Sequence, residues 1–275
     1  MKAPKPDCSI LIATHDRVDM LRHALRSAMA QTYQNIEIVV YDDASTDATE
    51  FQVLSLLGTD RRIRYYRAPQ NHGVGNARAE LLELARAPYA CWLDSDDLCN
   101  IHRVEIQLAV MKKYKPSFVR TGRTVFGSAR RAEAGVWCET PQRLHNLMKS
   151  RASMVSPSLM FDVKKAIEIG YDRVLRCGSD VVWEMKATLA HGRGLLIPMT
   201  LYHYGRGHRT RVTKMVKAAK TAPIFEKSLV RKNALCEELE RELQRAGIPR
   251  WPRILSNDEM DAVLIDLKTP EKTGG

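Results

Sequence analysis

Four short apolar segments in the first hundred residues alternate with segments of helical periodicity, and this alternation constrains the fold more than any other feature. The apolar segments are rich in residues that favour strands and lie at 9–13, 36–41, 63–66 and 89–93. Between them, apolar residues recur at helical spacing in 20–28, 51–57 and 77–85. Short links between such units predict an α/β fold with a mostly parallel central sheet flanked by helices.

Beyond residue 100 the alternation is less regular. The pattern predicts helices at 101–114, 141–149, 163–169, 180–191 and 225–246. It predicts strands at 118–125, 158–161 and 195–204, the last interrupted by Pro198. We therefore expect one α/β domain over residues 1–210, followed by a basic helical C-terminal extension over residues 211–275.

Charge is unevenly distributed along the chain, whose formal net charge is +11. Residues 1–110 hold 12 Lys and Arg against 15 Asp and Glu, whereas residues 111–275 hold 31 against 17. A basic half attracts polyanions such as nucleic acid or an anionic membrane surface, although a solvated basic face needs no partner. The chain lacks a signal-like segment and an apolar run of about 18 residues, which favours a cytoplasmic protein that could be peripheral to the membrane. The six cysteines form no Cys-x-x-Cys pair and are expected to be buried, reduced thiols.

The acidic motif at residues 94–97, Asp-Ser-Asp-Asp, directly follows the fourth predicted strand. Carboxylates two residues apart in an extended turn can bind one hard cation, and Mg²⁺ or Mn²⁺ prefers such oxygen ligands. A cation held there would neutralise a diphosphate leaving group. The alternative interpretation is an acidic turn that caps the next helix.

Other polar residues follow the first three strands. Thr14 and Asp16 follow the first, and Asp43 follows the second, where Ser45 or Asp47 could cap the next helix. Because ligands of parallel sheets bind beyond the C-terminal ends of the strands, these residues are expected to meet the acidic motif. Asp43 could accept a hydrogen bond from a nucleobase.

A glycine-bearing loop at 71–78 opens the third predicted helix. Its glycines would let the backbone approach a ligand, and Arg78 would add a fixed positive charge for phosphate. The loop matches neither a phosphate-binding P-loop nor the dinucleotide-binding pattern, so on its own it is a weak signal.

Several segments together resemble the opening of family 2 glycosyltransferases. These are 9–17, 31–47, Asn71-x-Gly73, Ala77-Arg78 and 93–97, in register over about residues 7–115. The resemblance implies the GT-A fold of nucleotide-diphospho-sugar transferases and inverting, metal-dependent transfer from a nucleotide sugar, which we expect to be a UDP-sugar. It implies a donor half at 7–115 and an acceptor half at 116–210. Ala79 replaces the usual Asn, and His15-Asp16 replaces Tyr-Asn or Phe-Asn, which leaves the identity of the sugar nucleotide open.

By matching positions, the resemblance assigns roles to individual residues. The donor would be bound by Ala13, Thr14, Asp16, Asp43, Arg78, Asp94 and Ser95. Asp96 would bind Mn²⁺ or Mg²⁺, with Asp94 near the ribose.

The catalytic base of this family usually lies in an acidic pair opening a later helix. Asp180 in Gly178-Ser179-Asp180 is similar and is our candidate, although it could instead only cap its helix. Trp183 could contact the sugar or acceptor, or could pack in the core.

An aromatic–Arg–x–His motif often lies near the end of the fold, and Tyr204 to His208 resembles it. His208 would complete the metal shell or contact the diphosphate, with His203 as a second candidate. Arg206 would contact the acceptor or a phosphate.

The sequence leaves the acceptor open. One hypothesis is a glycan or lipid-linked intermediate at a membrane surface. A second is DNA carrying hydroxymethylated bases, which the basic half would favour. A third is a non-catalytic nucleic-acid-binding protein on a transferase fold, against which the intact acidic motif argues. The oligomeric state is not determined by the sequence.

Overall fold

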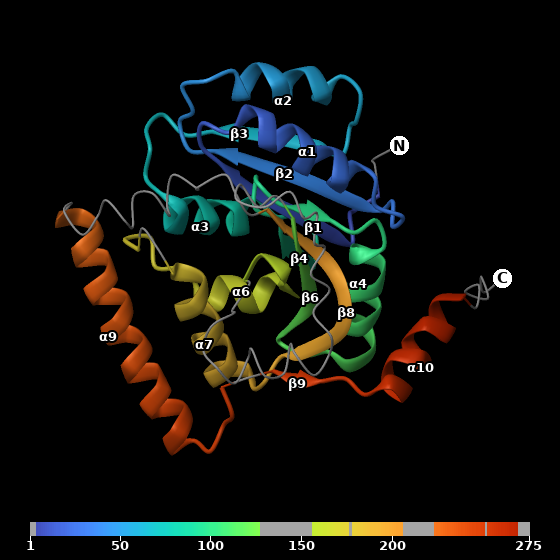
Figure 1. Cartoon of the computed structure of the whole chain (residues 1–275), viewed down its shortest axis with the longest axis vertical. Helices are drawn as coiled ribbons and strands as arrows, with labels where there is room; N and C mark the ends of the chain where they lie inside the picture. Colours follow the sequence, from blue (N-terminus) through green and yellow to red (C-terminus); the bar gives the residue numbers. More distant parts are fainter. Residues whose placement is uncertain (1–3, 127–155, 176–177, 206–222, 251, 269–275) are drawn as a thin grey trace.

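The computed structural model describes residues 4–126, 156–175, 178–205, 223–250 and 252–268. The described strands join one mixed sheet with helices on both faces (Figure 1). The strands are β1 (Cys8–Thr14), β2 (Ile36–Asp42), β3 (Ile63–Arg67), β4 (Tyr89–Trp92), β5 (Leu98–Cys99), β6 (Phe118–Phe126), β7 (Met160–Asp162), β8 (Leu195–Gly205) and β9 (Arg253–Ile254). The helices are α1 (Val18–Met29), α2 (Thr49–Leu57), α3 (Val74–Leu84), α4 (Arg103–Tyr114), α6 (Val163–Ile169), α7 (Ser179–His191), α9 (Pro223–Arg245) and α10 (Asn257–Lys268), with a 3₁₀ turn at Ser156–Ser158.

The sheet has the order β3-β2-β1-β4-β7-β6-β8-β5, and β9 pairs with β8. β1 lies parallel to β2 and β4, and β2 lies parallel to β3, as the alternating pattern predicts. β7 runs antiparallel to both β4 and β6. The C-terminal ends of β1, β2 and β4 therefore lie side by side at one edge of the sheet.

The central strands are continuous apolar runs because both of their faces are covered. Along β1, Ile10 and Ile12 pack in a cluster that includes α1 and α4 residues. Leu11 points to the opposite face and packs in a cluster that includes Leu81 of α3. Burial on both faces explains why β1 and β2 lack the alternation of apolar and polar residues that marks a half-exposed strand.

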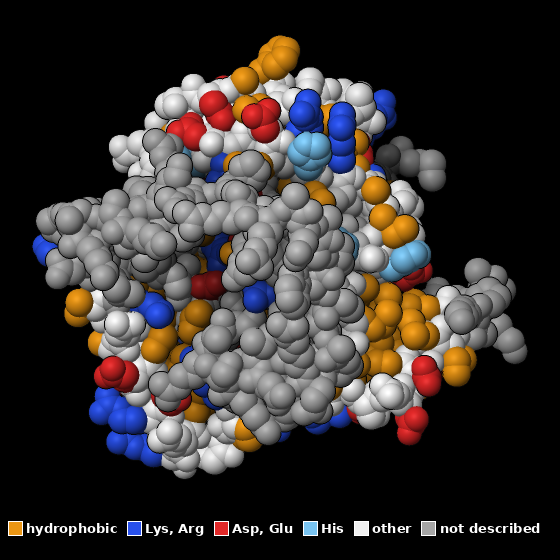
Figure 2. All heavy atoms as spheres, in the orientation of Figure 1, with side chains coloured by type: hydrophobic (Ala, Val, Ile, Leu, Met, Phe, Trp, Pro, Cys, Tyr) orange, Lys and Arg blue, Asp and Glu red, His pale blue; other side chains and the backbone are white. Residues whose placement is uncertain are grey.

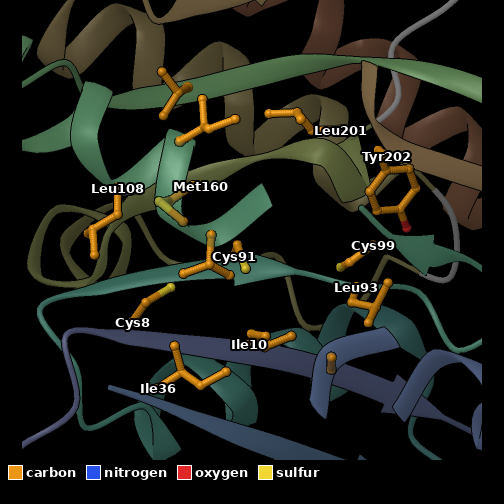
Figure 3. Packing of buried hydrophobic residues seen from close by; sticks show 14 of the residues in the cluster. Cys8, Ile10, Ile36, Cys91, Leu93, Cys99, Leu108, Met160, Leu201 and Tyr202 are labelled. Atoms are coloured by element: carbon orange, nitrogen blue, oxygen red, sulfur yellow. The ribbon is translucent and has the colours of Figure 1, made fainter. Parts of the chain in front are cut away.

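Three cysteines lie within this core. Figure 3 shows Cys8, Cys91 and Cys99 among the apolar side chains of the first cluster. These three are buried free thiols, and Cys236 on α9 is a partly buried one. Cys138 and Cys177 lie outside the described residues.

The C-terminal extension is helical, but it also takes part in the sheet. α9 packs on α7 through a small core that includes Val182, Leu239 and Leu243. β9 adds to the sheet by pairing with β8, and α10 lies against α4 (Figure 1). The described part of the extension therefore joins the sheet through β9 and packs through α9 and α10 on α7 and α4.

Most predicted elements are present, with differences in detail. β8 is one strand, but its pairing with β6 shifts register between Ile197 and Thr200, at the predicted interruption by Pro198. β5, β9 and α10 were not predicted. α1 has Arg17 at its N-cap position and no side-chain cap bond, and Asp19 lies in its first turn. The N-cap residue of α2 is Ala48, without a side-chain cap bond, although Asp47 just before it accepts a hydrogen bond from Thr49 N at 3.0 Å. The helix predicted at 141–149 lies outside the described residues.

The surface shows some exposed apolar side chains. On the face in Figure 2, hydrophobic side chains project over α2, where Phe51 and Leu54 are exposed, and gather beside α4 and α10. Within the described ranges, no helix combines the length and apolar character needed to cross a bilayer.

Candidate active site

The loops that follow β1 and β2 are fastened to each other. Asp43 N donates to Thr14 O at 2.9 Å, and Asp16 N donates to Ser45 Oγ at 2.9 Å. Asp16 accepts from Thr46 N at 2.7 Å and has a φ of 50°, in the left-handed region. The predicted donor-binding positions Ala13, Thr14 and Asp16 therefore lie at the expected sheet edge, on a backbone fixed from both sides.

Asp43 fastens the glycine loop. Its two carboxylate oxygens accept hydrogen bonds from His72 N at 2.9 Å and Gly73 N at 2.7 Å. Gly73 has a φ of 91°, which a side chain would make unfavourable. The sequence interpretation gave Asp43 only a nucleobase to bind, whereas the structure also gives it this loop-fixing role.

Gly75 has a packing role that the sequence interpretation missed. A Cβ atom placed there would lie 2.5 Å from Asp172 O and 2.6 Å from Leu175 O. Its absence lets the segment before α7 approach the N-terminus of α3. The sequence predicted that the glycines of this loop let the backbone approach a ligand. At Gly75, the group that comes close is instead the backbone of Asp172 and Leu175.

The acidic motif gathers three carboxylates. Asp94, Asp96 and Asp97 each place an oxygen atom within 4.8 Å of the others, so they could hold a metal ion. Ser95 is buried between them in the chain. Burial, together with the charges of Asp96 and Asp180, raises the pKa of Asp94.

Asp97 is the buried support of this motif. Its carboxylate accepts from Tyr202 OH at 2.6 Å and from Gly205 N at 2.7 Å. Tyr202 OH also accepts a hydrogen bond from Asp94 N at 3.3 Å. Burial, with the charges of Asp94 and Asp96, raises the pKa of Asp97 to about 8. Tyr202 therefore ties the acidic motif to β8.

Two arginines balance the other two acids. Arg17 Nη1 lies 2.6 Å from Asp96 Oδ2, and Arg78 Nη2 lies 3.2 Å from Asp94 Oδ1. The guanidinium carbon of Arg78 lies 5.3 Å from the centroid of the Trp92 ring. Arg78 is only 5% exposed, so its charge acts in a poorly hydrated environment.

Arg78 also reaches the candidate base. Its Nη1 lies 3.8 Å from Asp180 Oδ2. Asp180 stands in the first turn of α7, but the helix is preceded by Gly178 and no side chain caps it. The structure thus brings Asp94 and Asp180 together around one guanidinium, and the capping alternative for Asp180 does not hold.

The prediction that Trp183 could contact the sugar or the acceptor is not supported by its position. The side chain is 2% exposed and packs in the core, stacked on Tyr171 with ring centroids 5.6 Å apart. It also contacts Phe161 at 5.3 Å between centroids. Trp183 follows Asp180 by three positions but points inward from α7, so we assign it to packing and not to contact with an acceptor.

The aromatic–Arg–x–His motif is only partly described. Arg206 and His208 lie outside the described residues. His203, the second candidate, hydrogen-bonds through Nδ1 with Thr124 Oγ1 at 2.5 Å, and burial lowers its pKa. It is the strand neighbour of Tyr202 and points to the other side of β8, away from the acidic motif.

Several residues near the site were not identified from the sequence. Arg17 appeared only inside the matched segment 9–17, and nothing marked Tyr202. The buried guanidinium of Arg103 donates to Trp92 O, Pro157 O and Leu159 O, and lies over the Tyr202 ring. A buried ion pair joins Arg120 of β6 to Glu184 of α7. Only long-range contacts reveal these roles, and sequence spacing does not report them.

The fold and the acidic site can be compared with those of known proteins. The model of the family "Glycosyl transferase family 2" matches residues 9–170, more than half of the chain. The chain belongs to glycosyltransferase family 2. The match covers the acidic motif and Arg78, but ends before Asp180.

This family 2 glycosyltransferase resembles several curated proteins over part of its length. It is 36% identical over 108 residues to an uncharacterized glycosyltransferase of Rickettsia bellii, covering 39% of this chain and 15% of that protein. It is 32% identical over 111 residues to WfgD of Escherichia coli, a UDP-Glc:alpha-D-GlcNAc-diphosphoundecaprenol beta-1,3-glucosyltransferase, covering 40% and 43%. It is 30% identical over 118 residues to TuaG of Bacillus subtilis, a putative teichuronic acid biosynthesis glycosyltransferase, covering 43% and 47%. The chain thus spans less than half the length of each of these relatives.

Solved structures show the same fold. TarS 1–349 of S. aureus in complex with UDP-GlcNAc superposes with a TM-score of 0.67 at 17% identity, covering 95% of this chain and 71% of that one. The mannosyltransferase PcManGT of Pyrobaculum calidifontis, in complex with GDP-Man and Mn²⁺, gives 0.59 at 17% identity, covering 96% and 75%. The GT-A fold predicted from the sequence is confirmed.

Proposed function

We propose that this glycosyltransferase transfers a sugar from a UDP-sugar to a hydroxyl of an anionic acceptor, with inversion at the anomeric carbon. The observation that carries the proposal is Arg78, which lies 3.2 Å from Asp94 and 3.8 Å from Asp180. A donor-binding acid and a candidate base thus share one buried cation. Such an arrangement suits a reaction in which an acceptor hydroxyl attacks a bound sugar.

The choice of UDP rests on similar proteins. The name of WfgD specifies UDP-Glc, and TarS was solved with UDP-GlcNAc. PcManGT was solved with GDP-Man, so a GDP-sugar is the main competing donor. Asp43 and the loop that it fastens would contact the nucleoside in either case.

A divalent cation fits the acidic motif. Three carboxylates within 4.8 Å supply the oxygen ligands that Mg²⁺ and Mn²⁺ prefer. Asp97 is already occupied by Tyr202 and Gly205, so Asp96 and Asp94 would hold the cation. The cation, when bound, would neutralise the diphosphate as it leaves.

The residues of the chain would supply the rest of the chemistry. Asp180 would take the proton of the acceptor hydroxyl while its oxygen forms a bond to the anomeric carbon. The bond from that carbon to the diphosphate would break, and its electron pair would leave with the diphosphate. Arg78 would orient Asp180 toward the donor, because its guanidinium contacts Asp94 as well.

For the acceptor, we favour a glycan or lipid-linked intermediate over DNA. The printed name of WfgD gives a diphosphoundecaprenol-linked sugar as its acceptor, and TuaG is named for teichuronic acid biosynthesis. The excess of Lys and Arg over residues 111–275 suits an anionic acceptor of this kind.

The donor is tested by thermal unfolding with UDP-, GDP- and dTDP-sugars, each with Mn²⁺, with Mg²⁺ or with EDTA. A ligand at 100 times its Kd adds about 2.7 kcal/mol to the free energy of unfolding. We expect a UDP-sugar to raise Tm only when the divalent cation is present. If a UDP-sugar raised Tm equally in EDTA, the result would contradict the metal site. If only a GDP-sugar raised Tm, the donor would be a GDP-sugar and not a UDP-sugar.

The acceptor is tested by transfer of the selected sugar to diphosphoundecaprenol-linked glycans and, separately, to hydroxymethylated and unmodified DNA duplexes. Transfer to the lipid-linked glycan supports the proposal, whereas transfer only to the hydroxymethylated duplex supports a DNA acceptor. A protein that binds nucleic acid, turns over no donor and is unaffected by Asp96→Ala would be a non-catalytic binding protein.

A further inference from the structure

Arg17 forms the closest ion pair of the acidic motif. Its Nη1 lies 2.6 Å from Asp96 Oδ2, and the two side chains are only 14% and 12% exposed. Asp96 is also the residue to which the family resemblance assigns the metal. A guanidinium of the chain and a divalent cation would therefore compete for the same carboxylate.

The backbone of Arg17 is well fixed, whereas its side chain is long. The preceding residue, Asp16, is tied to the β2–α2 loop through Ser45 and Thr46. Arg17 O accepts a hydrogen bond from Leu21 N at the start of α1. The guanidinium can thus change partner by side-chain rotation alone, without movement of the sheet edge.

Arg78 differs from Arg17 in this respect. Arg78 contacts Asp94 and Asp180 and lies over the Trp92 ring, so several contacts oppose its movement. Within the described ranges, Arg17 forms its ion pair with Asp96. Displacing Arg17 therefore breaks one ion pair, and this loss is offset when another anion pairs with the displaced guanidinium.

We propose that Arg17 is an exchangeable counter-ion of Asp96 that gives way to the divalent cation and passes to the diphosphate of the donor. This inference rests on the proposed function of the site. Arg17 would oppose binding of the metal alone, because its charge would lose its partner in a poorly hydrated position. A diphosphate arriving with the metal removes that penalty, so metal and nucleotide bind cooperatively through Arg17.

The test measures Mn²⁺ affinity from the EPR signal of free Mn²⁺, with and without UDP, for the wild type and for Arg17→Gln. In the wild type we expect UDP to tighten Mn²⁺ binding about tenfold or more, a typical coupling between two ligands. In Arg17→Gln we expect Mn²⁺ alone to bind several-fold more tightly and the effect of UDP to shrink. Arg17→Lys keeps the charge and should retain most of the coupling.

The matched control is Arg26→Gln, which removes one positive charge from the exposed side of α1, the helix that directly follows Arg17. It should leave both Mn²⁺ affinities as in the wild type. Wild-type behaviour of Arg17→Gln, or weaker binding of Mn²⁺ alone, would overturn the exchange. Absence of Mn²⁺ and UDP binding in the wild type would instead overturn the proposed function, so the two failures are distinguishable.

Discussion

Replacement of Tyr202 by Phe isolates the hydroxyl that connects the acidic motif to β8. The change keeps the ring, which lies 4.9 Å from the guanidinium carbon of Arg103, and removes two hydrogen bonds. A hydrogen bond to a charged group is worth about 1.5–3 kcal/mol, and one between neutral groups about 1 kcal/mol. Because the pKa of Asp97 is raised to about 8, its carboxyl is largely protonated at neutral pH, and the lower value applies there. With a similar contribution from Asp94 N, we expect Tyr202→Phe to lower the free energy of unfolding by about 2 kcal/mol.

The measurement is urea unfolding at pH 7 in EDTA, followed by circular dichroism. The matched control is Tyr204→Phe, which makes the same change two residues later on β8, where the ring lies over Arg123 at 5.2 Å. Tyr204 is half-buried, but among the described residues no hydrogen bond joins its hydroxyl to the acidic motif, so we expect the control to change the free energy of unfolding by no more than about 0.5 kcal/mol. If Tyr202→Phe is no less stable than Tyr204→Phe, the hydroxyl does not support the acidic motif and the reasoning fails.

Three further predictions test the base, the loop packing and the docking of α10. Asp180→Asn should lower kcat by about 10²–10⁴-fold and should keep the rise in Tm that the donor causes. The control Asp258→Asn, in the first turn of α10, should match the wild type. Near-normal turnover of Asp180→Asn would show that Asp180 is not the base. Gly75→Ala should cost at least about 2 kcal/mol in urea unfolding, because its Cβ would lie 2.5 Å from a carbonyl oxygen, and Gly58→Ala, with 3.8 Å of room, should cost nothing; equal stabilities would contradict the packing. The pKa of Glu259 is lowered to about 2 by hydrogen bonds from Arg253 and Ser256, so its contribution to stability is present above the unfolded pKa near 4.5 and is lost as pH falls toward 2. Glu259→Gln should make the free energy of unfolding depend less on pH between about 4.5 and 2. An unchanged dependence would show that the ion pair of Glu259 with Arg253 contributes little to stability.

The sheet edge could be predicted because strand ends are local features. Buried strands are recognised in a sequence as apolar runs. The polar residues that follow them closely, such as Asp43 and Asp94, must lie where the strands end. The position of Asp180 came instead from family resemblance, since nothing in its own spacing places it beside Arg78. The structure supplies that proximity through the packing of α7 near α3.

Short elements and inward-facing residues were harder to predict. β5 and β9 have two residues each, which is too few to show a period. α10 differs from these strands, because Met260 and Val263 recur at helical spacing and both are buried. Trp183 could not be assigned, since an aromatic residue in the first turns of a helix can face either a ligand or the core.

The partners of the acids could not be predicted, and charge explains why they matter. Two carboxylates about 4 Å apart repel by about 4 kcal/mol at an effective dielectric constant of about 20, so a cluster of three persists only if other groups offset it. Asp96 and Asp94 are offset by Arg17 and Arg78, and the raised pKa of Asp97 offsets its charge with a proton. Asp180 shares Arg78 with Asp94, so these six groups together carry about one net negative charge without any metal. A divalent cation alone changes that charge by two positive charges, and the diphosphate of a nucleotide sugar alone changes it by about two negative ones. Together they leave the net charge nearly unchanged, which is why we expect metal and donor to bind as a pair rather than in succession as independent ligands.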